Sequence, residues 1–229
     1  MSDGARLAVD IGGTFTDVVL EHGGGQDSVK LLTTPDAPDR AVLEGVGDIL
    51  RRTGVSASDV TLVIHGTTLA TNALIERKGA LTALVTTDGF RDSIEIAYEH
   101  RFEQYDLYME RPLPLVARDW RFSVPERIAA DGSVLLDLDE GVLRALAGDL
   151  DKAGVEAVAI CFLHSYMNPD HEQRAGAILA EALPNVAVTL SAEVCPEIRE
   201  YDRMSTACAN AYVQPMMARY LGELESGLA

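Results

Sequence analysis

Short apolar runs separated by glycine clusters open the chain. The runs are Leu7 to Ile11, Thr16 to Leu20 and Val29 to Thr33, and the separators are Gly12-Gly13-Thr14 and Gly23-Gly24-Gly25. Glycine clusters between apolar runs are typical of tight turns between strands. The pattern therefore predicts an antiparallel meander of three strands.

Helical and strand patterns then alternate. Apolar residues at one-face spacing predict a helix from Asp39 to Arg52, ended by Gly54 in the left-handed conformation. The next elements are a strand at Thr61 to Ile64, a helix at Thr71 to Arg77 closed by Gly79, and a strand at Leu81 to Thr86. The order is βββαβαβ, which indicates an α/β fold.

Aromatic residues and prolines follow without a helical or alternating period. Six of the 13 aromatic residues gather here: Tyr98, Phe102, Tyr105, Tyr108, Trp120 and Phe122. Long loops of this kind are uncommon unless they pack or bind something. We expect an ordered excursion that packs within the chain, with docking on a partner surface as the alternative.

Alternation resumes towards the C-terminus. Asp131-Gly132 predicts a hairpin with a two-residue turn, because both central residues of such a turn need positive φ. Further elements are helices at Asp139 to Ala153 and Asp170 to Ala182, strands at Ala157 to Phe162 and Val186 to Leu190, and one or two helices from Ile198 to Leu228 broken at Pro215. We expect one domain over residues 1–195 and the truncated start of a helical domain over residues 196–229.

Composition narrows the function classes. Nineteen Lys and Arg residues stand against 36 Asp and Glu, a formal net charge of −17, which disfavours nucleic acid and anionic membranes as partners. The 47% apolar content is typical of a globular protein, and no apolar stretch reaches the roughly 18 residues of a membrane span. Because residues 1–6 do not read as a secretory signal, we expect a cytoplasmic location. The three widely spaced cysteines favour reduced structural thiols.

The segment from Asp10 to Asp17 is the strongest candidate for chemistry. Gly12 and Gly13 would let backbone N–H groups converge on phosphate oxygens, and Thr14 and Thr16 could add hydroxyl donors. Asp10, at the end of the preceding strand, is placed to hold Mg²⁺. The alternative is an ordinary hairpin whose glycines only serve the turn.

Two further groups of polar residues follow predicted strands, where ligands commonly bind in α/β folds. His65 could donate to a phosphate or a substrate carbonyl, and further donors are Thr67, Thr68 and Asn72. The alternative is that Thr68 or Thr71 caps the next helix. Arg91 could contact a carboxylate or phosphate beside Asp92, or could simply pair with Asp92 or Glu95.

Four segments resemble the N-terminal region of the hydantoinase A / 5-oxoprolinase family. They are Asp10-Ile-Gly-Gly-Thr-Phe-Thr-Asp17, His65-Gly-Thr-Thr-Leu-Ala-Thr-Asn-Ala-Leu-Ile-Glu-Arg-Lys-Gly79, Thr86-Thr-Asp-Gly-Phe-Arg-Asp92 and Glu193-Val-Cys-Pro-Glu-Ile-Arg-Glu-Tyr201. The resemblance covers nearly the whole chain and implies a ribonuclease H-like lobe of the actin, Hsp70 and sugar-kinase type. The first segment also occurs in sugar kinases, but the second argues against that assignment.

The resemblance implies an ATP-dependent, Mg²⁺-using hydrolase that phosphorylates the carbonyl of a lactam or hydantoin before ring opening. Gly12, Gly13 and Thr14 would then cradle ATP phosphates beside Asp10, and His65 and Arg91 would act in catalysis. A hydantoinase B-type partner and an oligomeric enzyme are further implications. The alternatives are the ATP-binding subunit of an acetone or acetophenone carboxylase and a non-catalytic assembly module. Because the family's second phosphate loop belongs to its C-terminal half, we expect weak or absent ATPase activity from these 229 residues alone.

Overall fold

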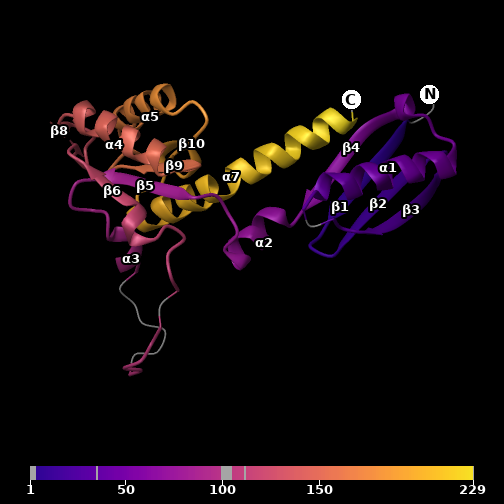
Figure 1. Ribbon diagram of the computed structural model, residues 1–229, viewed down its shortest axis with the longest axis horizontal. Coiled ribbons are helices and arrows are strands. Elements are labelled where there is room, and N and C mark those ends of the chain that lie inside the picture. Colours follow the sequence, from indigo (N-terminus) through magenta and orange to yellow (C-terminus); the bar gives the residue numbers. More distant parts are fainter. Residues whose placement is uncertain (1–3, 35, 99–104, 111, 229) are drawn as a thin grey trace. The chain divides into compact units, whose positions relative to one another are not determined.

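The computed structural model describes residues 4–34, 36–98, 105–110 and 112–228. The chain divides into two compact units, one formed by Met1–Glu76 with Met216–Ala229 and the other by Arg77–Pro215. Each unit has its own sheet, labelled in Figure 1. The α/β class predicted from the sequence is confirmed.

The first unit is built on a four-stranded sheet in the order β3-β2-β1-β4. Its elements are β1 (Ala5–Ile11), β2 (Phe15–His22), β3 (Gly25–Leu32), α1 (Pro38–Thr53), a 3₁₀ turn (Ala57–Asp59), β4 (Val60–Thr67) and α2 (Leu69–Glu76). The first three strands are antiparallel and β4 runs parallel to β1. The predicted meander and the predicted helix ended by left-handed Gly54 are therefore confirmed.

One face of this sheet packs against α1. Alternate residues of β1, among them Leu7, Val9 and Ile11, form a core with Val42 and Ile49 of α1. In Figure 1, α1 lies across the strands. The intervening β1 residues, including Asp10, lie on the opposite face, because successive side chains of a strand alternate. The sheet therefore presents Asp10 away from its helix-covered core.

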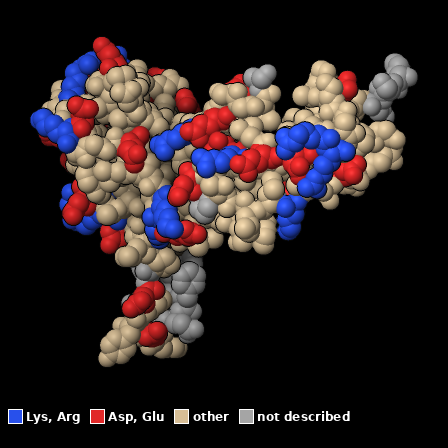
Figure 2. All heavy atoms as spheres, turned by 45° about the vertical axis from the view of Figure 1, so that its right-hand side comes forward, with Lys and Arg blue, Asp and Glu red and all other residues tan. Residues whose placement is uncertain are grey.

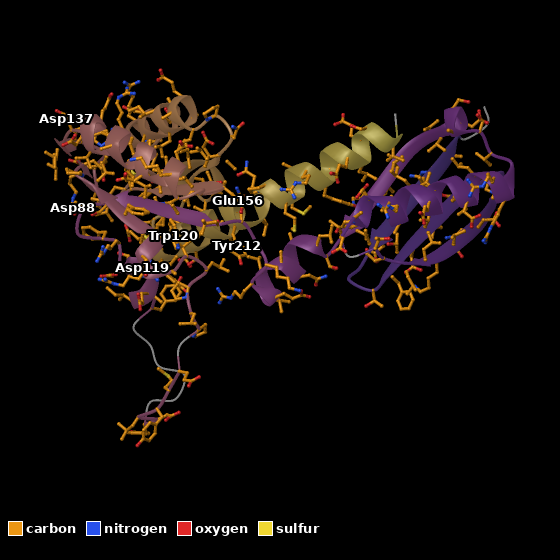
Figure 3. The ribbon with its side chains drawn as sticks, viewed as in Figure 1. Asp88, Asp119, Trp120, Asp137, Glu156 and Tyr212 are labelled. Carbon is orange, nitrogen blue, oxygen red and sulfur yellow. The ribbon has the colours of Figure 1, made fainter. Side chains whose placement is uncertain are left out.

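The second unit has a parallel sheet in the order β10-β9-β5-β6. Its elements are β5 (Thr82–Thr87), α3 (Ser93–Ile96), a 3₁₀ turn (Arg118–Trp120), β6 (Arg121–Val124), β7 (Arg127–Ile128), β8 (Val134–Leu136), α4 (Glu140–Lys152), β9 (Ala157–Cys161), α5 (Asp170–Ala182), β10 (Ala187–Leu190), α6 (Ser191–Val194) and the first part of α7 (Glu200–Leu228). Most helices and strands predicted here are confirmed to within a few residues. Figure 3 labels Asp88, directly after β5, and Glu156, directly before β9, near opposite ends of this sheet.

Both faces of the second sheet are buried. Val85 and Ile160 face a core formed with α4 and α5, whereas Leu84 and Ala159 face a core formed with the first part of α7. The three cysteines are free, and Cys161 and Cys208 are buried in the second of these cores. Strands covered on both faces are typically continuous apolar runs, as β9 is, whereas β5 also buries three threonines.

Three predictions about helices and strands need correction. The order βββαβαβ holds, but β5 joins the second sheet rather than completing the first. Pro215 lies inside α7 and does not end it. The segment from Arg121 to Val124, taken as part of an aromatic excursion, is strand β6, because it finds a parallel partner in β5. The local pattern of apolar residues does not reveal such a long-range pairing.

The hairpin at Asp131-Gly132 exists, but its turn differs from the predicted one. Gly132 has a φ of 85°, whereas Asp131 is absent from the described residues with positive φ. Ala129 donates to Ser133 and accepts from Gly132, so three residues lie in the loop. This is the geometry of a hairpin loop that needs glycine only at its last position.

The aromatic excursion does not pack as expected over its whole length. Tyr105 and Tyr108 are 91% and 90% exposed, whereas Trp120 and Phe122 pack against the core of the second unit. Phe102 lies outside the described residues. The prediction of packing within the chain is thus wrong for Tyr105 and Tyr108.

Charged side chains are mixed on the surface. On the face shown in Figure 2, Lys and Arg lie among Asp and Glu. Among the residues described, no helix has both the length and the apolar character needed to span a membrane.

Candidate functional site

The loop between β1 and β2 is braced by the end of β3. Gly12 N–H donates to the Phe15 carbonyl at 2.9 Å, and Thr33 donates its amide to the Thr14 carbonyl and its hydroxyl to the Gly12 carbonyl, each at 2.9 Å. The predicted phosphate loop therefore has a defined conformation. The amide of Gly12, however, is used within the turn.

Two successive amides of this loop are open. Within the described part of the chain, the N–H groups of Gly13 and Thr14 donate to no acceptor, and both residues are exposed. Successive unpaired amides form concavities that bind anions. A Cβ on Gly13 would stand 3.2 Å from Asn72 Nδ2, so close approach of α2 favours glycine at this position.

Asp10 lies beside this loop at the carboxyl end of β1. It pairs in register with Gly66 of the parallel strand β4, and a Cβ on Gly66 would stand 3.3 Å from Asp10 Oδ1. Glycine at position 66 thus leaves room for the carboxylate, which is exposed. Asp10 is free to face a ligand held by the loop.

The start of α2 closes the other side of the site. Thr67 Oγ1 accepts from the Leu69 amide at 3.1 Å, so Thr67 caps this helix rather than Thr68 or Thr71. Thr68 N–H donates to the Ile11 carbonyl at 3.2 Å, and Asn72 Nδ2 donates to Thr68 Oγ1 at 3.3 Å. The helix N-terminus, which favours anions, is thereby tied to the end of β1.

His65 lies on the opposite face from Asp10, in register with Val9. Its Nε2 is 2.8 Å from the Tyr220 hydroxyl. Burial raises the pKa of the Tyr220 phenol to about 12, so the phenol is protonated in this pair. Burial also lowers the pKa of His65, an effect that the Asp10 carboxylate opposes, and this favours the neutral imidazole. Nδ1 is buried without a partner among the described residues.

Thr16 faces the core instead of the loop. Its side chain is fully buried and its Oγ1 is 3.0 Å from Thr33 Oγ1. Because the Thr33 hydroxyl donates to the Gly12 carbonyl, Thr16 is the donor in this pair. Thr16 supports the loop through Thr33, while its predicted contact with a nucleotide stays a prediction.

Arg91 and Asp92 belong to the second unit, and they do not form the expected pair. Asp92 accepts two hydrogen bonds from Arg118, at 3.1 and 2.9 Å, and Glu95 pairs with Arg121 at 2.7 Å. The hydrogen bond from Arg118 lowers the pKa of the Asp92 carboxyl. The predicted pairing of Arg91 was wrong because Arg118 and Arg121, remote in sequence, come closer. Arg91 itself is exposed.

The structure brings eight of the predicted residues to one edge of the first sheet: Asp10, Gly12, Gly13, Thr14, His65, Thr67, Thr68 and Asn72. Three residues that sequence reasoning missed support them. Thr33 braces the loop, Gly66 makes room for Asp10, and Tyr220 holds His65. Of these three, only Gly66 lies in a segment that resembles the family, so the sequence drew attention to Gly66 alone.

The donor set is compatible with Mg²⁺ bound together with a polyphosphate. Among the described residues, no three His, Cys, Asp or Glu side chains group as a metal site. Mg²⁺ usually keeps several waters and takes one or two carboxylates together with substrate phosphates. A single exposed carboxylate, Asp10, beside open amides fits that mode of binding.

Comparison with known proteins shows similarity to one family over most of the chain. A family model described as the hydantoinase/oxoprolinase N-terminal region matches residues 6–183. Caprolactamase subunit alpha of Pseudomonas jessenii is 42% identical, over 96% of this chain and 33% of the relative. The acetophenone carboxylase gamma subunit of Aromatoleum aromaticum is 34% identical, over 94% of this chain and 32% of the relative.

A solved structure is also similar. The crystal structure of the ATP-dependent caprolactamase from Pseudomonas jessenii superimposes with a TM-score of 0.87 at 40% identity, over 97% of this chain and 33% of that one. The chain thus spans about a third of the length of these relatives.

Proposed function

Because this chain belongs to the hydantoinase/oxoprolinase family, whose N-terminal region it matches, we propose that it is the N-terminal part of an ATP-dependent enzyme that opens a cyclic amide. The observation that carries the proposal is the pair of open amides at Gly13 and Thr14 beside the exposed carboxylate of Asp10. Amides that converge on one point and a neighbouring carboxylate are what a metal-bound polyphosphate requires.

ATP overcomes the low reactivity of the amide. Resonance makes a lactam carbonyl a weak electrophile, so its oxygen first takes the γ-phosphoryl group of ATP and ADP is released. Water then adds to the activated carbon, the ring C–N bond breaks, and a second water releases phosphate from the resulting acyl phosphate. In phosphoryl transfer the protein mainly positions groups and neutralises charge.

We assign residues of the first unit to phosphate binding and catalysis in this reaction. Gly13 and Thr14 bind phosphate oxygens through their amides, and the α2 N-terminus adds its dipole. Asp10 would hold Mg²⁺, which when bound neutralises phosphate charge. His65 would donate to a phosphate or carbonyl oxygen. We place Thr67, Thr68 and Asn72 near the substrate. Asp92, which we also assign to the substrate, and Arg91, which we assign to catalysis, belong to the second unit.

A carboxylase subunit is the second candidate within the family, favoured by the 34% identity to the acetophenone carboxylase gamma subunit. The same phosphate loop would serve ring opening and carboxylation, because each reaction uses ATP to activate an oxygen atom of an unreactive substrate. We further propose a cytoplasmic, oligomeric enzyme with a hydantoinase B-type partner. Assays of the complete enzyme with caprolactam, 5-oxoproline, N-methylhydantoin, and acetophenone plus bicarbonate distinguish the two candidates.

The decisive experiment replaces Asp10 by Asn in the complete enzyme. We expect ATP-dependent turnover to fall by about 10² to 10³, the usual effect of removing a group that stabilises transition-state charge. Asp27→Asn is the matched control, because Asp27 is an exposed carboxylate of the same sheet that already pairs with His22. Asp27→Asn should leave turnover within about twofold.

An assembly module predicts a different outcome. If the chain only docks a partner, for example through exposed Tyr105 and Tyr108, Asp10→Asn leaves turnover unchanged and replacement of the tyrosines disrupts the complex. Subunit composition, measured by size-exclusion chromatography with light scattering, separates loss of chemistry from loss of assembly. Full turnover by Asp10→Asn in an intact complex contradicts the proposed phosphate site.

A further inference from the structure

A pocket of about 470 Å³ lies in the second unit, at the carboxyl edge of its parallel sheet. Its walls include Phe90 after β5, Leu163 and His164 after β9, and Arg127 after β6. Figure 3 shows Asp88 at this end of β5. The carboxyl edge of a parallel sheet is the usual place for ligand sites in α/β folds, and the volume suits a small ligand. None of these wall residues belongs to the site proposed above.

The lining carries two guanidinium groups, Arg127 and Arg199, and one carboxylate, Glu200. With His164 neutral, the formal charge of the described lining residues is +1, in a chain whose net charge is −17. In the described part of the chain, neither Arg127 nor Arg199 forms an ion pair. The two guanidinium groups are therefore available to an anionic ligand.

The carboxylate next to Arg127 in the sequence is already engaged and does not pair with it. Glu126, adjacent to Arg127 in sequence, is buried and accepts hydrogen bonds from the Thr87 hydroxyl and from His171 Nδ1. Arg127 instead lies over the Phe90 ring, with its Cζ 4.8 Å from the ring centroid. A guanidinium stacked on an aromatic ring keeps its in-plane N–H groups available for a carboxylate or phosphate.

The walls are held by hydrogen bonds of their own. Thr87, buried at the end of β5, accepts the Leu163 amide on its hydroxyl at 2.9 Å and the Phe90 amide on its carbonyl at 3.0 Å. His164 donates from Nδ1 to the Ile128 carbonyl at 2.8 Å, which fixes the ring and leaves Nε2 as an acceptor. The loops after β5, β6 and β9 are thus linked before any ligand binds.

Backbone strain gathers at the same pocket. Among the described residues, three other than glycine have positive φ, and two of them, Ala97 at 53° and His164 at 54°, line it. Such conformations cost free energy and cluster at ligand sites. The strain adds support to a site already indicated by the geometry and charge.

The pocket adjoins an apolar cavity. That cavity, of about 560 Å³, is lined by residues such as Ile94, Leu113 and Cys208, and it shares Ala97, Tyr98 and Tyr201 with the pocket. The Tyr98 and Tyr201 rings meet edge to face, with centroids 5.0 Å apart. Apolar and aromatic walls next to two arginines suit an anion that carries a hydrocarbon part better than an inorganic ion.

The geometry points to a binding site for a small organic carboxylate, with the carboxylate on Arg127 and Arg199 and the hydrocarbon part against the aromatic walls. This site is separate from the proposed phosphate loop and does not depend on the reaction assigned to it. Its occupation is measured as binding, so its failure and the failure of the proposed function have different readouts.

The test is a titration of the 229-residue chain with hexanoate, followed by amide chemical shifts in the NMR spectrum. We expect saturable shifts at Phe90, Arg127 and His164. Hexanamide, which has the same size without the charge, should bind at least about tenfold more weakly, as expected when a charge-assisted pair is lost. Inorganic phosphate should also bind at least about tenfold more weakly than hexanoate if the hydrocarbon part contributes.

Matched variants complete the test. Arg127→Gln and Arg199→Gln should each weaken hexanoate binding by about tenfold or more. Arg144→Gln is the control, because it removes the same charge from exposed helix α4 of the same unit. Unchanged thermal unfolding midpoints verify that the variants are folded.

Three outcomes overturn the proposal. They are no saturable binding of hexanoate, equal binding of hexanoate and hexanamide, and loss of binding in Arg144→Gln equal to that in Arg127→Gln. Phosphate binding as tight as hexanoate binding, at the same residues, overturns the assignment to an organic carboxylate.

Discussion

The two sheets differ in how many of their faces are covered. In the second unit, β5 and β9 are buried along their whole length, because helices pack on both faces. In the first unit, β4 is an edge strand, and it exposes the apolar residues Leu62, Val63 and Ile64 on both of its faces. An apolar run therefore predicts a strand but not its burial, which depends on the layers that the rest of the fold supplies.

The candidate sites differ in a related way. The phosphate loop of the first unit is made by residues close together in sequence, and backbone amides supply its donors. The arginine-lined pocket of the second unit collects side chains from residues 90 to 201. A site made of backbone is visible in a motif, whereas a site made of distant side chains needs the tertiary structure.

The largest expected effect on stability is in the second unit, at Glu172. This carboxylate is fully buried and accepts hydrogen bonds from the amides of Phe162 and Ala192 and from the Ser191 hydroxyl. Glu172→Ala leaves these buried donors without an acceptor and should lower the free energy of unfolding by about 3 kcal/mol or more. Fluorescence of Trp120, the single tryptophan, reports unfolding of this unit during denaturant titration.

Glu181→Ala, on an exposed position of the same helix α5, is the control and should change stability by about 0.5 kcal/mol at most. Equal effects of the two substitutions would show that the buried hydrogen bonds of Glu172 contribute nothing.

The intermediate effect is in the first unit, where α1 approaches the sheet at Gly45. A Cβ there would stand 2.7 Å from Val18 Cγ2 and 2.8 Å from Leu31 Cδ1. Gly45→Ala should therefore destabilise the unit by about 1 to 3 kcal/mol through overpacking. Hydrogen exchange measured by mass spectrometry should locate the loss of protection in β2, β3 and α1.

Gly47, in the same helix, is the matched position. A Cβ there meets only Arg51 Nη1, the end of a flexible side chain, at 3.1 Å. Gly47→Ala should stabilise the protein by up to about 1 kcal/mol, the helix-propensity difference between the two residues. If both alanine variants change stability in the same direction, the close approach at Gly45 is not what limits packing.

The smallest effect is at the hydrogen bond between Tyr220 and His65. Tyr220→Phe removes the hydroxyl that pairs with Nε2 and should cost about 0.5 to 1.5 kcal/mol. Chemical denaturation at pH 8, where His65 is neutral in both states, measures this cost. A variant as stable as the parent would show that water or another group replaces the phenol.

The pH dependence of stability sharpens the comparison, because the two units should respond in opposite directions. Burial lowers the pKa of His65 below its ordinary 6.5, so the unfolded state takes up the proton first as the pH falls. The contribution of neutral His65 to the free energy of unfolding is therefore lost as the pH falls below 6.5. Burial raises the pKa of Glu172 above its ordinary 4.5, so the folded state holds the proton longer and stability falls as pH rises through that range.

Substitution tests the assignment of the two slopes. His65→Gln should remove the first slope, and Glu172→Gln should remove the second. Unfolding free energies measured from pH 4 to pH 8 provide the check. A slope that persists in its own variant belongs to another group.

Much of the secondary structure was predictable because it depends on local pattern. The helices at Asp39 and Asp170 and the opening meander follow from periodicity, glycine and proline. Arg203 shows the limit. Arginine is normally exposed, yet Arg203 is fully buried and donates to the carbonyls of Phe162 and Glu197. Charge alone does not reveal a buried carbonyl that needs a donor.

The sequence by itself determined the family, the α/β class and the loop of residues 10–17 as a phosphate-binding candidate. These follow from contiguous residues, whose backbone conformation and spacing are local properties. Only the tertiary structure decided that β5 joins a second sheet, that Tyr220 holds His65, and that Arg127 and Arg199 share one pocket. Such contacts join residues tens of positions apart, and they depend on which surfaces pack together when the chain folds.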